Sequence, residues 1–86
     1  MKHSCHITSD KKLNEDDIQI IISKLSREFN FEYSSINSSK YDIVIISDFD
    51  DYGTLSDMKL FVRRFTSELK KLNHIISYQW YDNFKN

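Results

Sequence analysis

The 86-residue chain contains no proline, one glycine and one cysteine, and these scarcities exclude several classes of protein. One cysteine cannot close an internal disulfide bond, which is typical of proteins in a reducing cytoplasm. One glycine rules out a glycine-rich phosphate-binding loop. No run of about 18 apolar residues is present, and residues 1–12 lack the apolar segment of a signal peptide. We therefore expect a cytoplasmic protein without a membrane-spanning helix.

Neither sign of charge is in excess, because 12 Lys and Arg residues oppose 13 Asp and Glu residues and the formal net charge is -1. This balance excludes a generally basic protein that coats nucleic acid, and also a strongly acidic mimic of DNA. Hydrophobic residues make up 40% of the chain, which is enough for one modest core. We therefore expect residues 1–86 to form one compact domain.

Two amphipathic helices are predicted from apolar residues that recur every three or four positions. The first covers about 14–29, where Asn14 suits an N-terminal cap and three acidic residues follow it. Its apolar stripe consists of Ile18, Ile21, Ile22, Leu25 and Phe29. The second covers about 55–72, with a stripe of Met58, Phe61, Val62, Phe65, Leu69 and Leu72.

Four strands are predicted around these helices, at residues 3–8, 31–36, 41–47 and 75–81, with a turn at 37–40. The resulting order, β-α-β-β-α-β, is typical of the ferredoxin-like plait. In this α+β fold two helices pack on one face of a four-stranded antiparallel sheet, and the expected strand order is 4-1-3-2. The fold by itself indicates no function, because many unrelated activities use it.

The other face of the predicted sheet is left open, and a partly apolar open face is a common interaction surface. Alternation in the last strand places Tyr81 on this face. The strand at 41–47 has apolar residues on both sides, so the sequence leaves its orientation open. In one arrangement Val44 and Ile46 face outward. In the other they face the helices, and the neighbouring Ile43 and Ile45 lie on the open face.

Acidic side chains are densest between this strand and the second helix. The segment contains Tyr52 and four aspartates, Asp48, Asp50, Asp51 and Asp57. An EF-hand calcium loop beginning at Asp48 is rejected, because Lys59 stands where that loop requires a bidentate glutamate. Three interpretations remain: a solvated loop that caps the helix, a generic divalent-cation site, and an acidic contact surface for a basic partner.

RNA-recognition-motif proteins share the plait and stack bases on aromatic side chains of the first and third strands. The third strand here (YDIVIISD) lacks their basic-glycine-aromatic signature, and the first strand has no aromatic residue except histidine. Lys59, Arg63 and Arg64 on the second helix are interpreted as part of a solvated helix face. The pattern therefore disfavours base stacking on the sheet.

No residue pattern indicates an enzyme. The chain has no nucleophile elbow and no Cys–His pair at a telling spacing. His6 and His74 fall on or beside adjacent predicted strands, but two histidines alone define no reaction. His3, Cys5 and His6 cannot share one metal ion, because a strand directs neighbouring side chains to opposite faces. We therefore predict no catalytic residue, no metal site and no cofactor.

These observations predict a small non-enzymatic protein-binding module. We expect a stoichiometric inhibitor of a larger protein or nucleoprotein complex, of the phage anti-defence (anti-CRISPR) or toxin-immunity type. Its partner would be a larger, basic, nucleic-acid-handling complex, bound through the acidic segment and the open face. The residues expected to bind are Asp48, Asp50, Asp51, Tyr52, Asp57, Val44, Ile46 and Tyr81. Two alternatives stay open: a nucleic-acid-binding or nuclease-like plait, and a homodimeric structural domain.

Overall fold

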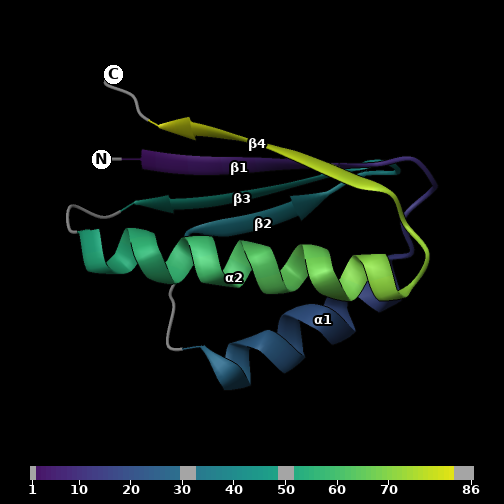
Figure 1. The fold of residues 1–86 in the computed structure, drawn as a ribbon, viewed down its shortest axis with the longest axis horizontal. Helices are drawn as coiled ribbons and strands as arrows, with labels where there is room; N and C mark the ends of the chain where they lie inside the picture. Colours follow the sequence, from purple (N-terminus) through teal and green to yellow (C-terminus); the bar gives the residue numbers. More distant parts are fainter. Residues whose placement is uncertain (1, 30–32, 49–51, 83–86) are drawn as a thin grey trace.

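The protein folds into two layers, a sheet and a pair of helices that cover one of its faces (Figure 1). The computed structural model describes residues 2–29, 33–48 and 52–82. The elements follow in the order β1 (Lys2–Ser9), α1 (Glu15–Glu28), β2 (Ser35–Ser38), β3 (Asp42–Asp48), α2 (Tyr52–Lys71) and β4 (Ile76–Asp82). All strand pairs are antiparallel and the sheet order is β2-β3-β1-β4. The predicted ferredoxin-like plait is therefore confirmed, strand order included.

Two element boundaries differ clearly from the prediction. β2 was expected at 31–36, but the described strand begins at Ser35 and continues to Ser38, inside the predicted turn. Serine and asparagine favour strands weakly on their own, and pairing with the buried strand β3 overrides that preference. The second helix was expected to begin after Gly53, but α2 already begins at Tyr52.

The core lies between the two layers and is built mainly from the predicted helix stripes. Its fully buried members include Leu25, Phe61 and Phe65, and the rings of the two phenylalanines lie 6.0 Å apart. Leu72 was predicted to join this stripe but is 44% exposed, because α2 ends one residue earlier, at Lys71. Neither described helix is long and apolar enough to cross a membrane.

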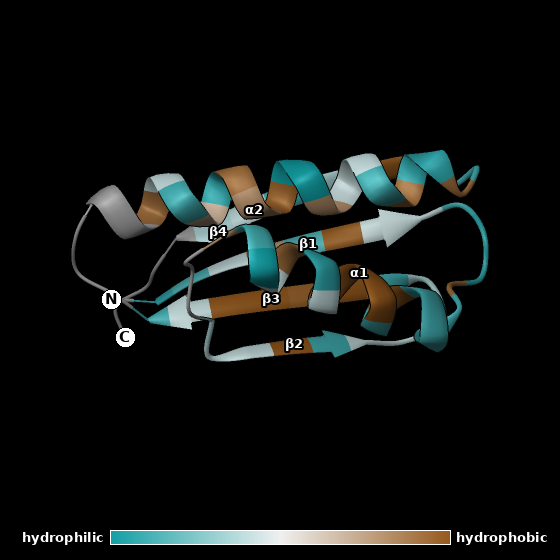
Figure 2. Cartoon of the chain, turned by 90° about the horizontal axis from the view of Figure 1, so that it is seen from below, coloured by the Kyte–Doolittle hydropathy of each residue, from teal (hydrophilic) through white to brown (hydrophobic). Residues whose placement is uncertain are grey.

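The packing decides the orientation of β3, which the sequence left open. Ile43 and Ile45 are completely buried and face the helices, whereas Val44 and Ile46 are half-buried and lie on the open face. In Figure 2, α2 runs along the side of the sheet formed by β4, and α1 lies in front of β3. The helices thus cover the face that carries Ile43, and neither of them covers the opposite face.

Asn73 closes α2 in a left-handed backbone conformation with φ 70°. The amide of Asn73 donates to the carbonyl of Lys70, and the amide of His74 donates to the carbonyl of Leu69. Asparagine and glycine tolerate this conformation, whereas a β-branched side chain does not. We expect Asn73→Val to lower the free energy of unfolding by about 1–2 kcal/mol and Asn73→Gly to leave it nearly unchanged. Urea denaturation measures both, and equal stabilities of the two variants would contradict the assignment.

Candidate functional site

The open face of the sheet has an uncharged centre. Strand register places Val44 between Asn37 and His6, and Ile46 between Ser35 and Ser4. The same register continues into β4 and completes the central set of eight side chains: Ser4, His6, Ser35, Asn37, Val44, Ile46, Gln79 and Tyr81. We call this set the central open face. The charged strand residues of the open face lie at the two ends of this set. Lys2 and Asp48 are register partners at one end, and Asp42 lies opposite Thr8 at the other.

An aromatic pair lies on the β1–β4 half of this face. The ring centroids of His6 and Tyr81 are 4.6 Å apart, and the rings are tilted by 60°. Beside them is an open hollow of about 290 Å³, whose lining includes Thr8, Ser77 and Gln79. Hydroxyl, amide and imidazole groups both donate and accept hydrogen bonds. The central open face can therefore form hydrogen bonds with a partner's polar groups while its two aliphatic side chains lose contact with water.

The structure brings together only some of the predicted binding residues. Val44, Ile46 and Tyr81 share the open face, and Asp48 lies at its end. Asp57 is exposed on α2, which belongs to the opposite layer. Tyr52 is the first residue of α2. The predicted contacts Asp50 and Asp51 lie outside the described residues, so the acidic segment is described in part.

The sheet separates His6 from Cys5 and His3, the two other residues considered above as metal ligands. Cys5 is completely buried between sheet and helices, and burial raises the pKa of its thiol to about 12. His3 is buried on the same side, whereas His6 lies on the open face. His74 shares a 2.7 Å hydrogen bond with Ser9 rather than approaching His6. Within residues 2–29, 33–48 and 52–82, no three His, Cys, Asp or Glu side chains are grouped to hold a metal ion.

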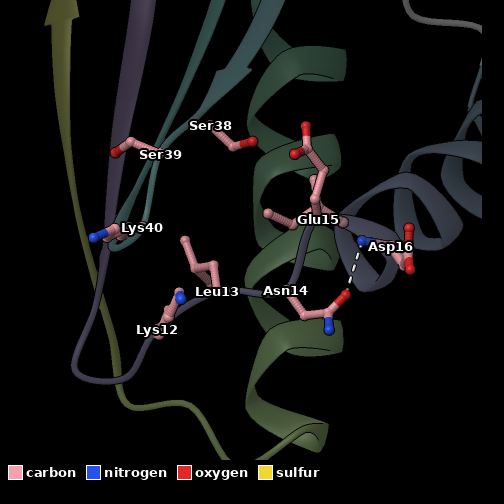
Figure 3. A pocket seen from close by; sticks show the side chains of 9 residues that line it. Lys12, Leu13, Asn14, Glu15, Asp16, Ser38, Ser39 and Lys40 are labelled. Carbon is pink, nitrogen blue, oxygen red and sulfur yellow. Dashed lines mark hydrogen bonds between the residues drawn. The ribbon is translucent and has the colours of Figure 1, made fainter.

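A hollow of about 520 Å³ lies at the start of α1, between the helix and the turn that joins β2 to β3. Figure 3 shows the side chain of Asn14 turned toward the first amides of the helix. Its Oδ1 accepts hydrogen bonds from the amides of Asp16 (2.8 Å) and Asp17 (3.2 Å). These amides already have a partner, and carboxylates surround them, so the geometry is that of a helix cap.

A second groove lies on the helix side of the sheet, beside the edge strand β4. It has a volume of about 310 Å³ and is lined by Leu55, Lys59, Arg63, Tyr78 and Trp80. We call it the β4 groove. The three helical residues are four positions apart, so they project from one side of α2. From the sequence, Lys59 and Arg63 were interpreted as part of a solvated helix face, because no local pattern shows that they lie beside the edge strand.

Three other cations of the helices, Lys24, Arg64 and Lys71, are engaged in ion pairs. Lys24 lies 3.1 Å from Glu68, and Arg64 lies 2.6 Å from Glu28, so these pairs bridge α1 and α2. The side chains of Lys24 and Lys71 also hold the pKa of Glu68 below its usual value, chiefly through hydrogen bonds. Among the described residues, no carboxylate lies within ion-pair distance of Lys59 or Arg63.

Comparison with known proteins identifies the fold but no relative of known function. No protein family model matches the chain, and no curated protein matches it. The de novo designed protein Foldit4 is 19% identical, with a TM-score of 0.59, and the alignment covers 98% of this chain and 100% of that one. Protein Atu4242 from Agrobacterium tumefaciens is 12% identical, with a TM-score of 0.53, and the alignment covers 99% of this chain and 95% of that one. At such low identity these likenesses show the fold alone.

Proposed function

We propose that this protein is a non-enzymatic protein-binding module that acts through the central open face. One observation carries the proposal: eight adjacent side chains without formal charge lie at the centre of an exposed sheet, in a chain of which 29% is charged. The cores of protein interfaces are depleted in charge and enriched in aromatic residues such as tyrosine. Serine, asparagine and tyrosine also dominate antibody surfaces that bind proteins.

The same face suits nucleic acid poorly. Binding to a phosphate backbone requires several cations, each of which neutralises a phosphate. Among the described residues of the four strands, Lys2 is the one lysine or arginine, and it lies at the end of the face. Protein binding is therefore favoured over nucleic-acid binding at this surface.

More specifically, we propose that the protein is a stoichiometric inhibitor of the anti-defence or toxin-immunity type and that it acts in the cytoplasm. Asp48, at the end of the face, and the adjoining Asp50 and Asp51 would contact a basic surface on the partner. Complementary charge of this kind accelerates association more than it adds affinity. A partner that normally holds nucleic acid presents such a surface, and the carboxylates would take the place of phosphates there.

A paired-variant pull-down from host lysate tests the proposal. Val44→Thr/Ile46→Thr removes the two aliphatic side chains from the open face and keeps residues that favour strands. Ile20→Thr/Leu60→Thr is the matched control, because both side chains are exposed on the helices. The parent and the control are expected to retain a protein partner in stoichiometric amount. The open-face variant is expected to bind it at least about tenfold more weakly, which corresponds to about 1.4 kcal/mol.

Three outcomes decide against the proposal. Equal recovery by the two double variants would show that the central open face is not the interface. Recovery that nuclease treatment abolishes would favour the nucleic-acid-binding alternative. A concentration-dependent dimer of the purified protein in light scattering, lost in Val44→Thr/Ile46→Thr, would favour the homodimeric domain. Circular dichroism spectra of all variants check that the fold is intact.

A further inference from the structure

The edge strand β4 lacks the features that usually prevent an edge from pairing with another chain. It is seven residues long (ISYQWYD), with no proline and no charge before Asp82. Natural sheets blunt their edges with lysines, prolines, bulges or very short strands. The other edge strand, β2, fits that pattern because it has only four residues. The β4 edge therefore offers a row of main-chain donors and acceptors to an incoming strand.

The β4 groove lies beside this edge and carries positive charge. Lys59 and Arg63 are exposed and belong to the same side of α2. Two cations at this spacing repel each other slightly, so they gain from an anionic ligand. The aromatic side chains of Tyr78, which is 48% exposed, and Trp80 complete the wall on the strand side.

The spacing of the groove residues matches that of an extended peptide. Leu55, Lys59 and Arg63 follow each other at four-residue intervals, about 6 Å along a helix. Alternate side chains on one face of a strand are about 6.6–6.8 Å apart. A strand added to β4 would thus place its residues i, i+2 and i+4 opposite these three side chains in turn.

We propose that the β4 edge and the β4 groove bind an extended acidic segment of another protein, which joins the sheet as a fifth strand. Main-chain hydrogen bonds to β4 hold the segment, and its alternate side chains enter the groove, as in β-strand addition generally. Because α2 and β4 run in opposite directions, Trp80 lies toward Leu55. A segment antiparallel to β4 therefore presents an apolar residue to Leu55, then carboxylates to Lys59 and Arg63, in the order apolar-x-acidic-x-acidic.

Charge favours an acidic segment over two other ligands that could bind at an open sheet edge, a second copy of the chain and a nucleic acid. A second copy of the chain, paired through β4, would bring Lys59 and Arg63 of both copies to the same seam, where like charges repel. A nucleic acid could stack on the aromatic side chains, but it has no alternating amide and carbonyl groups to pair with β4. Two cations also neutralise few phosphates. An acidic peptide can form main-chain hydrogen bonds with β4 and ion pairs with Lys59 and Arg63 at the same time.

The single tryptophan of the chain, Trp80, reports binding without a label. The probe is the blocked heptapeptide acetyl-Thr-Leu-Thr-Glu-Thr-Glu-Thr-amide, and the comparison peptide replaces both glutamates by lysine. The acidic peptide is expected to produce a saturable fluorescence change with 1:1 stoichiometry that weakens as salt is added. The absence of a saturable change at millimolar peptide, or equal binding of the lysine peptide, would overturn the proposal.

Variants of the protein test whether the peptide binds in the β4 groove. Lys59→Gln/Arg63→Gln is expected to lower the affinity at least tenfold. Lys12→Gln/Lys40→Gln is the matched control, because it removes the same charge from two exposed positions that line the hollow at the start of α1, and it should bind normally. Equal losses in the two double variants would show that only overall charge matters and would contradict the site. Val44→Thr/Ile46→Thr, on the opposite face of the sheet, should also bind normally, so this test is independent of the function proposed above.

Methylated peptides test strand addition itself. In an antiparallel pair, alternate residues direct their amides toward the neighbouring strand. Two versions of the peptide carry N-methyl groups on odd or on even residues. One version is expected to lose binding and the other to keep it. Equal affinity of both versions would overturn the proposal. Two competing occupants are tested in the same assay. The proposal is also overturned if an oligothymidylate binds more tightly than the peptide and displaces it, or if the protein forms a dimer that blocks peptide binding.

Discussion

Replacing Phe65 with alanine is expected to lower the free energy of unfolding by about 3–5 kcal/mol. The ring is completely buried between α2 and the sheet, 6.0 Å from the ring of Phe61, and its removal leaves a cavity that the surrounding residues cannot fill. Small domains are stable by only about 5–15 kcal/mol, so the variant would lose a large part of its stability. Urea denaturation followed by far-ultraviolet circular dichroism measures the difference.

A matched substitution separates cavity formation from a general effect of removing apolar groups from helices. Ile20 is also a large apolar residue of a helix, but its side chain is 65% exposed. We expect Ile20→Ala to change the free energy of unfolding by less than about 0.5 kcal/mol. A Phe65→Ala variant as stable as Ile20→Ala would show that the assigned packing of α2 is wrong.

The Cys5 thiol is expected to react with iodoacetamide at least about a thousandfold more slowly in the native protein than in the urea-unfolded chain. The thiolate is the reactive form. Burial raises the pKa of this thiol from its ordinary value of 9.0 to about 12, which lowers the thiolate fraction near neutral pH about a thousandfold. Mass spectrometry of timed samples measures the rate. Native labelling at the rate of the unfolded chain would contradict the buried position of β1.

The same pKa predicts how stability depends on pH. The folded protein holds the Cys5 proton more tightly than the unfolded chain does, so the stability due to this proton is complete below about pH 9. It is lost as the pH rises from about 9 toward about 12. The parent protein should therefore lose more stability than Cys5→Ala between pH 8 and pH 11. The two proteins differ at Cys5 alone, so the difference between their curves isolates this thiol, and parallel curves would contradict the prediction.

The candidate site could be predicted in part, because alternation along a strand is a local property. The position of Tyr81 on the open face follows from that alternation and from the larger apolar set on the other side of β4. Val44 could not be placed in the same way, because β3 is apolar on both sides. The β4 groove was not predicted, because Lys59 and Trp80 belong to elements that are distant in sequence and meet only in the packed structure.

The amino-acid sequence by itself determined the order of the elements and most of the core. Apolar residues at helical spacing and the Asn14 cap are local signals, and the split β-α-β order admits few arrangements of four strands. The tertiary structure alone decided which side of β3 is covered, because each side carries two adjacent aliphatic residues and helix packing chooses between them. It also decided that Ser35–Ser38 form a strand and that Lys59 and Arg63 lie beside the open edge of β4. These outcomes depend on contacts between distant segments, whose free energy exceeds the weak local preferences of the residues involved.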